Sequence, residues 1–214
     1  MERIFFSFLT VFSLIITFSF KNSRNCGPVD YVKIDSKIIL FAEKKQGDHM
    51  VWGYYFFTDK AKKQVLAINV GCCMSPVNVY IFYKDQIPPR LIKHYEFHYR
   101  HNQISKEPLS YIKERIKNAT ILKEEFFITK KGIKLGTSYK DIINTYGIPD
   151  KIEIIRCNPR VVKYHWYVLG KEEAKSIPEV IKEKVCQELD FGYESYIEFV
   201  EGKASVIYFY YEQP

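Results

Sequence analysis

Three side chains of the metal-ligand type lie close together in this sequence, at His94, Glu96 and His98. Aromatic and polar residues alternate through residues 90–100, which predicts a half-exposed strand. Residues two apart on a strand point to the same side, so the three side chains could converge on one cation, as in some zinc sites. The alternative, which we favour, is a solvated polar strand face beside Arg100. We therefore predict no bound metal and no cofactor.

Five cysteines follow the first twenty residues: Cys26, Cys72, Cys73, Cys157 and Cys186. An odd number leaves at least one free thiol or an intermolecular bridge in an oxidising compartment. The lack of a C-x-x-C pair excludes a thioredoxin-like motif and a zinc ribbon. A bridge between Cys157 and Cys186 is compatible with the sequence, although connectivity does not follow from spacing. We interpret Cys72 and Cys73 as small buried hydrophobic residues that end a strand.

Catalytic signatures are missing from the sequence. It contains no G-x-S-x-G elbow, no H-E-x-x-H helix and no glycine-rich phosphate loop. Cys157 and His165 could face each other across a strand turn, but a chain with five of each residue offers some such pair by accident. We predict no catalytic residues and a protein that is not an enzyme.

The charge of the chain is basic, with a formal net charge of +7. Its lysines and arginines are scattered, acidic residues lie near most of them, and no long run of like charge appears. This pattern is typical of a solvated surface and differs from the clustered basic patch of a nucleic-acid-binding protein. We expect no nucleic-acid partner.

The first twenty residues resemble a secretory signal sequence. Residues 4–20 are almost continuously apolar, and Thr17 and Ser19 place small residues before a cleavage site. Two alternatives stay open: an uncleaved segment 4–20 would associate the protein with a membrane, and Cys26 could be lipidated. The sequence thus predicts export to the periplasm, the cell envelope or the extracellular space.

Residues 28–105 read as a β-rich region. Short segments rich in Val, Ile, Tyr and Phe are separated by turn residues, which predicts an antiparallel meander. These segments cover residues 37–42, 50–57, 64–73, 77–84 and, by alternation, 90–100.

Residues 106–214 combine both kinds of element, so the overall fold class we predict is α+β. Apolar residues at helical spacing predict a helix after Pro108. A second, short helix is capped by Thr137 or Ser138, with Asp141 three residues beyond Ser138 as in a capping box. It ends at Gly147, and Pro149 prevents continuation. A third helix is expected near 177–188. Strands are expected at 151–157, 161–169, 194–200 and 203–211, with a short one near 125–129.

The stretch GIKLGTSYKDIINTYGIPDKIE at 132–153 carries the one family resemblance. Its glycine, capped helix and Gly-x-Pro ending, with Gly136, Ser138, Gly147 and Pro149 at the matching positions, resemble the BamE-like (SmpA/OmlA) envelope domains, which are related in shape to β-lactamase inhibitor protein. The resemblance covers at most residues 125–214. It implies helices packed on an antiparallel sheet, in a non-enzymatic envelope protein that binds other proteins. The four residues form a structural motif, since turn chemistry explains each of them.

Three functional hypotheses follow, of which an enzyme without a recognisable motif ranks last. The first is an exported, non-catalytic envelope protein whose region 106–214 binds a protein partner. The second is a secreted module that binds a glycan or peptide through exposed aromatic side chains, with Trp52, Tyr54 and Tyr55 as candidates. An edge strand or exposed apolar patch would favour the first hypothesis, and a tyrosine-lined pocket the second.

Overall fold

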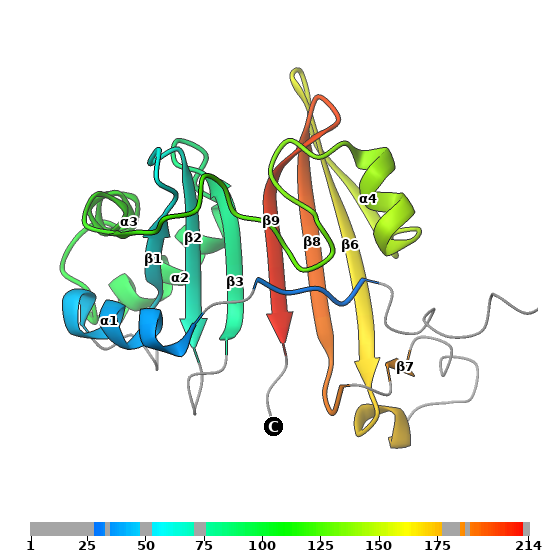
Figure 1. Ribbon diagram of the computed structural model, residues 1–214, viewed down its shortest axis with the longest axis horizontal. Helices are drawn as coiled ribbons and strands as arrows, with labels where there is room; N and C mark the ends of the chain where they lie inside the picture. The colour runs from blue at the N-terminus through cyan, green and yellow to red at the C-terminus, as the bar shows by residue number, and fades with distance from the viewer. Residues whose placement is uncertain are drawn as a thin grey trace, which may run out of the picture.

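The computed structural model describes residues 28–32, 35–47, 53–70, 76–176, 185–186 and 189–211. The signal-like segment, Trp52 and most of the expected helix at 177–188 lie outside these residues. The described helices are α1 (Ser36–Gln46), α2 (Pro89–Arg100), α3 (Pro108–Lys117), α4 (Tyr139–Tyr146) and the 3-10 helix η3 (Glu173–Ser176) (Figure 1). The strands are β1 (Tyr55–Thr58), β2 (Gln64–Val70), β3 (Pro76–Tyr83), β4 (Thr120–Ile121), β5 (Lys151–Cys157), β6 (Arg160–Gly170), β7 (Val185–Cys186), β8 (Tyr193–Val200) and β9 (Lys203–Tyr211).

All nine strands join one sheet, in the order β4-β1-β2-β3-β9-β8-β6-β5, with β7 paired to β6. Neighbouring strands are antiparallel except for the β1–β4 and β6–β7 pairs. The predicted α+β fold class is therefore confirmed. None of the described helices is long and apolar enough to cross a membrane.

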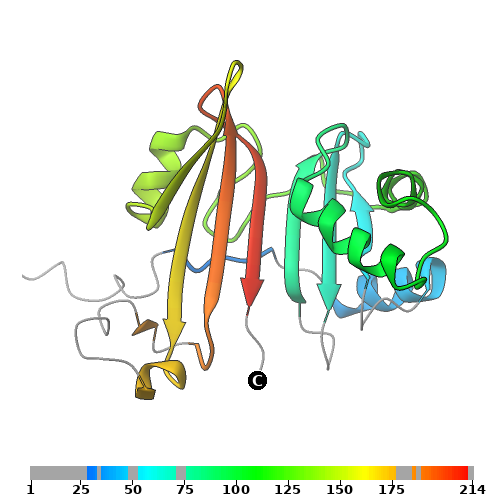
Figure 2. The same ribbon diagram turned by 180° about the vertical axis from the view of Figure 1, so that it is seen from behind.

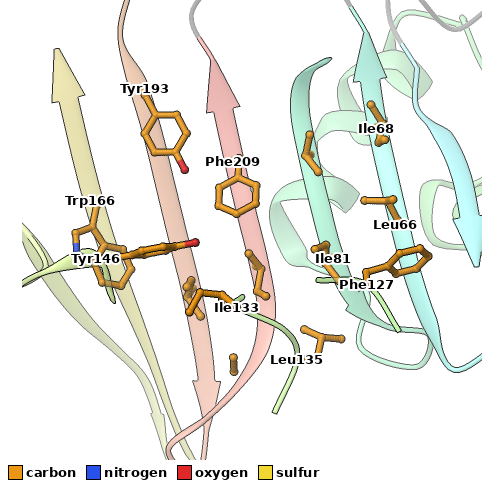
Figure 3. Close-up of a cluster of buried hydrophobic side chains, with 14 of the residues drawn as sticks. Leu66, Ile68, Ile81, Phe127, Ile133, Leu135, Tyr146, Trp166, Tyr193 and Phe209 are labelled. Carbon is orange, nitrogen blue, oxygen red and sulfur yellow. The ribbon is translucent and has the colours of Figure 1, made fainter. Parts of the chain in front are cut away.

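The two regions that we distinguished, 28–105 and 106–214, both contribute strands to this sheet. The position near residue 105 lies in the loop between α2 and α3. The last strand, β9, pairs with β3, so Ile207 lies beside Ile81 and Tyr208 beside Tyr80. The hydrophobic core on one face of the sheet runs across this pairing from β2 to β6 (Figure 3).

That first face of the sheet is apolar in register across its strands. One row of neighbouring residues consists of Phe57, Leu66, Ile81, Ile207, Ile197, Tyr164 and Ile152. Helix α1, helix α4 and the connecting chain at 127–135 cover this face and bury Ile39, Phe127 and Ile142 against it. Burial of such side chains stabilises the fold by about 1.5–3 kcal/mol each.

The opposite face is covered only in part by described helices. Helices α2 and α3 bury Leu91, Tyr95 and Ile112 against β1, β2 and β3. Seen from behind, these helices lie over one half of the sheet, and β6 and β8 lie beyond them (Figure 2). One row of this face stays buried from Phe56 on β1 to His165 on β6, and only its last residue, Lys151 on β5, is exposed.

Two predicted strands are helices in the structure. Residues 37–42 belong to α1, where Asp35 caps the first turn by accepting from the N–H of Lys37, and Gly47 ends the helix at φ 87°. Ile39 and Ala42, three residues apart, face the core, whereas Phe41 is exposed. The β-propensity of the segment is overridden by these end signals and by tertiary packing.

Residues 90–100, predicted as an alternating strand, form most of α2. Pro89 occupies the first helical turn, where its missing N–H costs no hydrogen bond. The buried residues Leu91, Tyr95 and His98 recur at helical spacing, and Phe97 is 58% exposed. The strand predicted from the alternation of aromatic residues is therefore wrong. The buried residues are spaced four and three apart, which is the period of a helix.

The other expected elements are largely present. The helix after Pro108, the capped helix before Gly147 and the strands at 151–157, 161–169, 194–200 and 203–211 are confirmed as α3, α4, β5, β6, β8 and β9. Near 125–129 the structure has only an isolated bridge, between Ile128 and Lys134. Within the expected helix at 177–188, the described residues Val185 and Cys186 form the short strand β7, so the helix is wrong for that part.

Candidate functional site

The metal candidates His94, Glu96 and His98 do not converge. On helix α2, residues two apart point to nearly opposite sides, so Glu96 is separated from the histidines. His94 and His98 are one turn apart, with ring centroids 4.7 Å from each other. His98 is buried, and its Nδ1 contacts the side-chain oxygen of Gln103. No group of three metal-ligand residues occurs among the residues that the structure describes.

The aromatic candidates for ligand binding are buried where the structure describes them. Tyr54 is 3% exposed and Tyr55 is fully buried. The Tyr54 ring packs edge-on against Tyr80 and His94, and its backbone N–H donates to the hydroxyl of Tyr95 at 3.1 Å. Strand β1 lies between packed helices on both faces, so the expectation of an exposed aromatic surface at Tyr54 and Tyr55 is wrong.

The possible bridge between Cys157 and Cys186 is excluded, whereas Cys26, Cys72 and Cys73 lie outside the described residues. Cys157 is a free, exposed cysteine and Cys186 is disulfide-bonded, so they do not bridge each other. Cys157 lies opposite Arg160, at the far end of β5 from the residue that pairs with His165. Six residues of strand separate the two positions, which is about 20 Å at ~3.3 Å per residue. Cys157 and His165 therefore cannot act as a catalytic pair.

The motif Gly136, Ser138, Gly147 and Pro149 positions α4 and the start of β5. Gly136 adopts φ +84° and donates its N–H to the carbonyl of Ala204 at 2.8 Å, which joins the chain before α4 to β9. The Ser138 hydroxyl accepts from the N–H of Asp141 at the start of α4. Gly147 ends the helix, and its carbonyl accepts from the Trp166 indole at 3.1 Å. The next residues then enter β5 beside β6.

A buried carboxylate at Asp30 holds α4 and the chain near 130 in place. Asp30 is 1% exposed. One of its carboxylate oxygens accepts from the hydroxyls of Tyr146, at 2.7 Å, and of Thr129. The other accepts from the backbone N–H groups of Tyr31 and Lys131, at 2.8 and 3.1 Å. Because both oxygens of this buried carboxylate accept hydrogen bonds, we interpret Asp30 as a structural anchor.

The edge strand β5 exposes a hydrophobic surface. Among the residues that the structure describes, it is the terminal strand of the sheet and pairs only with β6. Its isoleucines Ile152, Ile154 and Ile155 are 56%, 64% and 54% exposed, and nearby Ile148 is 86% exposed. Of these, Ile152 and Ile154 lie on the same face of β5, so they form a candidate surface for a contact with another molecule.

A small apolar groove lies beside this strand. It has a volume of about 200 Å³ and is lined by the side chains of Tyr139 on α4, of Val162 and Tyr164 on β6 and of Phe199 on β8, together with Arg160 and Gly202. Val162 is the direct neighbour of Ile154, and Tyr164 is the neighbour of Ile152. The groove and the two isoleucines therefore share one face of the sheet. We call these residues together the β5 groove.

The charges around the β5 groove are mainly basic. Lys151, Arg156 and Arg160 are exposed along the edge. The Glu153 carboxylate pairs with Lys151 and lies 3.2 Å from Nε2 of His165. Hydrogen bonds from Lys151 and then from His165 lower the pKa of Glu153, so this carboxylate stays ionised and paired. Of the exposed arginines, Arg160 lines the groove, whereas Arg156 is paired with Val161 and lies on the opposite face of the edge strand.

Two larger hollows flank α3. One of about 640 Å³ is lined by the bases Lys45, Lys106, Arg115 and Lys117 and by Glu114, among others. Lys45 and Arg115 donate to the carbonyls of Ala119 and Gln46, at helix ends. These bases thus complement the negative helix C-termini, which explains them without a ligand. The other hollow, of about 620 Å³, lies between α2 and α3.

The open part of the second sheet face is electrically balanced. Arg90 pairs with Glu194 at 2.9 Å and lies over the ring of Tyr208. Lys163 pairs with Glu198 at 2.8 Å and lies over the ring of Tyr196. Because each of these two bases has a carboxylate partner on the same face, their charges are balanced without a ligand.

Buried tyrosines predict a pH dependence of stability. Burial raises the pKa of Tyr193 and Tyr196 well above the usual value, and burial together with Tyr193 and Asp30 does so for Tyr146. The unfolded chain releases these protons above about pH 10, whereas the folded chain keeps them. The contribution of these tyrosines to the free energy of unfolding should therefore be constant below about pH 10 and should fall as the pH rises further.

An alkaline titration followed by phenolate absorbance, with circular dichroism as the measure of folding, checks this expectation. Part of the 17 tyrosines should ionise early and the rest only together with unfolding. Ionisation of all tyrosines in one step near pH 10, with the fold intact, would contradict it.

Comparison of the chain with protein-family models, curated proteins and solved structures found no match in any of the three.

Proposed function

We propose that this chain is an exported, non-catalytic protein that binds another protein through the β5 groove. The observation that carries the proposal is the exposed edge strand, whose isoleucines continue the apolar rows of the core into solvent. Soluble proteins rarely leave a contiguous apolar surface next to a free sheet edge unless it is an interaction site.

Two further observations support an exported protein with a protein-binding role. A disulfide at Cys186 fits export, because disulfides persist in oxidising compartments. The resemblance of residues 132–153 to BamE-like envelope domains also favours a protein-binding role, since the matching residues position α4 and β5, which border the groove. On this proposal the partner is another protein of the same exported compartment.

The size of the groove favours a protein partner over a small soluble ligand. Sites for drug-sized molecules typically enclose roughly 300–1,000 Å³. The β5 groove, at about 200 Å³, suits one or two apolar side chains. Protein interfaces commonly obtain much of their affinity from such anchor side chains in small pockets.

An affinity pull-down from gently solubilised source cells tests the proposal. The tagged wild-type protein is compared with the double variant Ile152→Ser/Ile154→Ser. A matched control, Leu40→Ser/Phe41→Ser, removes two exposed apolar side chains from α1, where they are 45% and 58% exposed.

We expect a protein that is retained at constant stoichiometry by the wild type and by the α1 control, and that is lost from the β5 variant. All three proteins should fold, since the changed residues lie on the surface. Equal retention by the β5 variant, or no retained protein at all, would overturn the proposal.

A further inference from the structure

The two exposed isoleucines on the groove side of β5 each end a row of buried apolar residues. Ile152 follows Ile197 and Tyr164, and Ile154 follows Ala204, Phe199 and Val162. Phe199 and Ala204 are almost fully buried, whereas Ile154 is 64% exposed. Each row therefore ends in an exposed isoleucine, a residue type that is usually buried. One more strand beside β5 would give both isoleucines a neighbour on the same face.

The backbone of β5 can accept such a strand. Neighbouring strands use one side of their N–H and C=O groups for each partner, and a terminal strand leaves its outer side open. At seven residues, β5 is long enough for several ladder hydrogen bonds, whereas β4, at the other end of the sheet, has two. The bulge between Ile154 and Arg156 bends only the last part of the strand.

The exposed basic side chains near β5 favour a partner strand that carries acidic residues. Arg156 and Lys151 lie near the two ends of β5 on the face away from the groove, and Arg160, opposite the end of β5, lines the groove. Glu153 is already paired with Lys151, and Glu201 accepts from the backbone N–H of Arg160 at 2.8 Å. An incoming segment with carboxylates thus meets exposed arginines. A second copy of this chain would bring the same bases and a net charge of +7.

We infer that β5 binds an extended segment of its partner by strand addition, and that this segment carries apolar side chains at alternate positions and carboxylates between or beside them. The alternate apolar side chains lie beside Ile152 and Ile154, on the face of the sheet that also carries the groove residues Val162 and Phe199. Main-chain hydrogen bonds supply affinity, and the isoleucines and the arginines supply specificity. This inference rests on the proposed function, since it specifies how the β5 groove recognises a protein.

Synthetic peptides test the inference with the intact protein. The probe is a blocked peptide of alternating glutamate and valine, about eight residues long, so that it spans β5. One control peptide replaces glutamate by lysine. A second carries N-methyl groups on alternate backbone nitrogens, with one version for each set of positions. Isothermal titration calorimetry measures binding to the wild type, to Ile152→Ser/Ile154→Ser and to Arg156→Gln/Arg160→Gln.

We expect the glutamate peptide to bind the wild type, and each protein variant to weaken binding by at least about tenfold. One of the two N-methylated versions should lose binding, because methylation removes the N–H groups that face β5 while leaving the side chains unchanged. This ligand-side control does not depend on the folding of any variant. Equal binding of the lysine peptide overturns the charge selection.

The outcomes separate the inference from the proposed function. Binding that depends on the isoleucines but tolerates both N-methylated peptides overturns strand addition and leaves a protein-binding groove. A second outcome is that the glutamate peptide does not bind, while the pulled-down partner still depends on Ile152 and Ile154. That outcome overturns the acidic extended segment and leaves the proposed function intact. A partner that is indifferent to the isoleucines overturns both.

Discussion

Replacement of Asp30 by alanine is expected to destabilise the protein by about 3–5 kcal/mol. The change removes the acceptor of two hydroxyls and two backbone N–H groups in a site that is almost completely buried. Each buried donor left unpaired costs about 1–3 kcal/mol, and water entering the site offsets part of that cost. A total of this size is a large share of the roughly 5–15 kcal/mol by which domains are stable.

Urea unfolding, followed by tryptophan fluorescence, measures the effect of Asp30→Ala. The variant Tyr146→Phe removes one of the four contacts and should cost about 0.5–1.5 kcal/mol. Asp85→Ala, at an exposed turn position, should change stability by no more than about 0.5 kcal/mol. A loss for Asp30→Ala that is no larger than for Tyr146→Phe would show that the carboxylate is not the anchor described above.

The same anchor links stability to the proposed binding site. Tyr146 is the last residue of α4, and Tyr139, its first residue, lines the β5 groove. Hydrogen exchange should therefore become faster in α4 of the Asp30→Ala variant before it does in β2 or β3, because the Asp30 carboxylate accepts directly from Tyr146 of α4.

Replacement of Gly170 by alanine is expected to cost about 3 kcal/mol or more. A Cβ at this position would lie far inside van der Waals contact of the backbone oxygen of Asp190 and the backbone nitrogen of Phe191. Those atoms cannot rotate away as a side chain could. The neighbouring chain is also held, because the N–H groups of Lys171 and Glu172 donate to the carbonyls of Leu189 and Asp190 at 2.8 and 2.9 Å. Overpacking usually costs about 1–3 kcal/mol, and backbone obstacles place this case at the upper end.

Gly132→Ala is the matched control for Gly170→Ala. Gly132 has φ +85° and nothing within 4 Å of an added Cβ, so its cost should be the conformational one alone, about 1–2 kcal/mol. Thermal and urea unfolding of the two variants should rank them clearly. If both variants lose the same stability, the close approach of residues 190–191 to β6 is not rigid in solution.

Sequence reasoning succeeded where the signals were local. The ends of α4 follow from Ser138, Asp141 and Gly147, whose hydroxyl, carboxylate and left-handed backbone act within one turn of the chain. The hairpin across Glu201 and Gly202 and the strands on both sides of Asn158–Pro159 follow from turn chemistry in the same way. These elements depend on neighbours in the sequence, so the sequence was sufficient to predict them.

The predictions from sequence were wrong where a segment carries two periodicities and tertiary packing determines which one is used. Residues 90–100 carry both a two-residue alternation and a helical spacing of Leu91, Tyr95 and His98. The sheet face that α2 covers decides which period is used. The change from strand to helix separates Glu96 from His94 and His98, so the candidate metal site failed together with the element that had positioned it. Tyr54 and Tyr55 failed for a related reason, because helices cover both faces of β1.

What the sequence determined by itself is the α+β class, the basic surface and the capped helix that leads into β5, since these depend on composition and on contacts within a few residues. The place of β5 at the end of the sheet was decided only by the tertiary structure. The segment 151–157 reads as a strand whether it is central or terminal. Its exposure follows from the pairing of β9 with β3, which puts β8, β6 and β5 in sequence outward from that junction. Strand order is set by contacts between residues more than a hundred positions apart, and no local pattern carries that information.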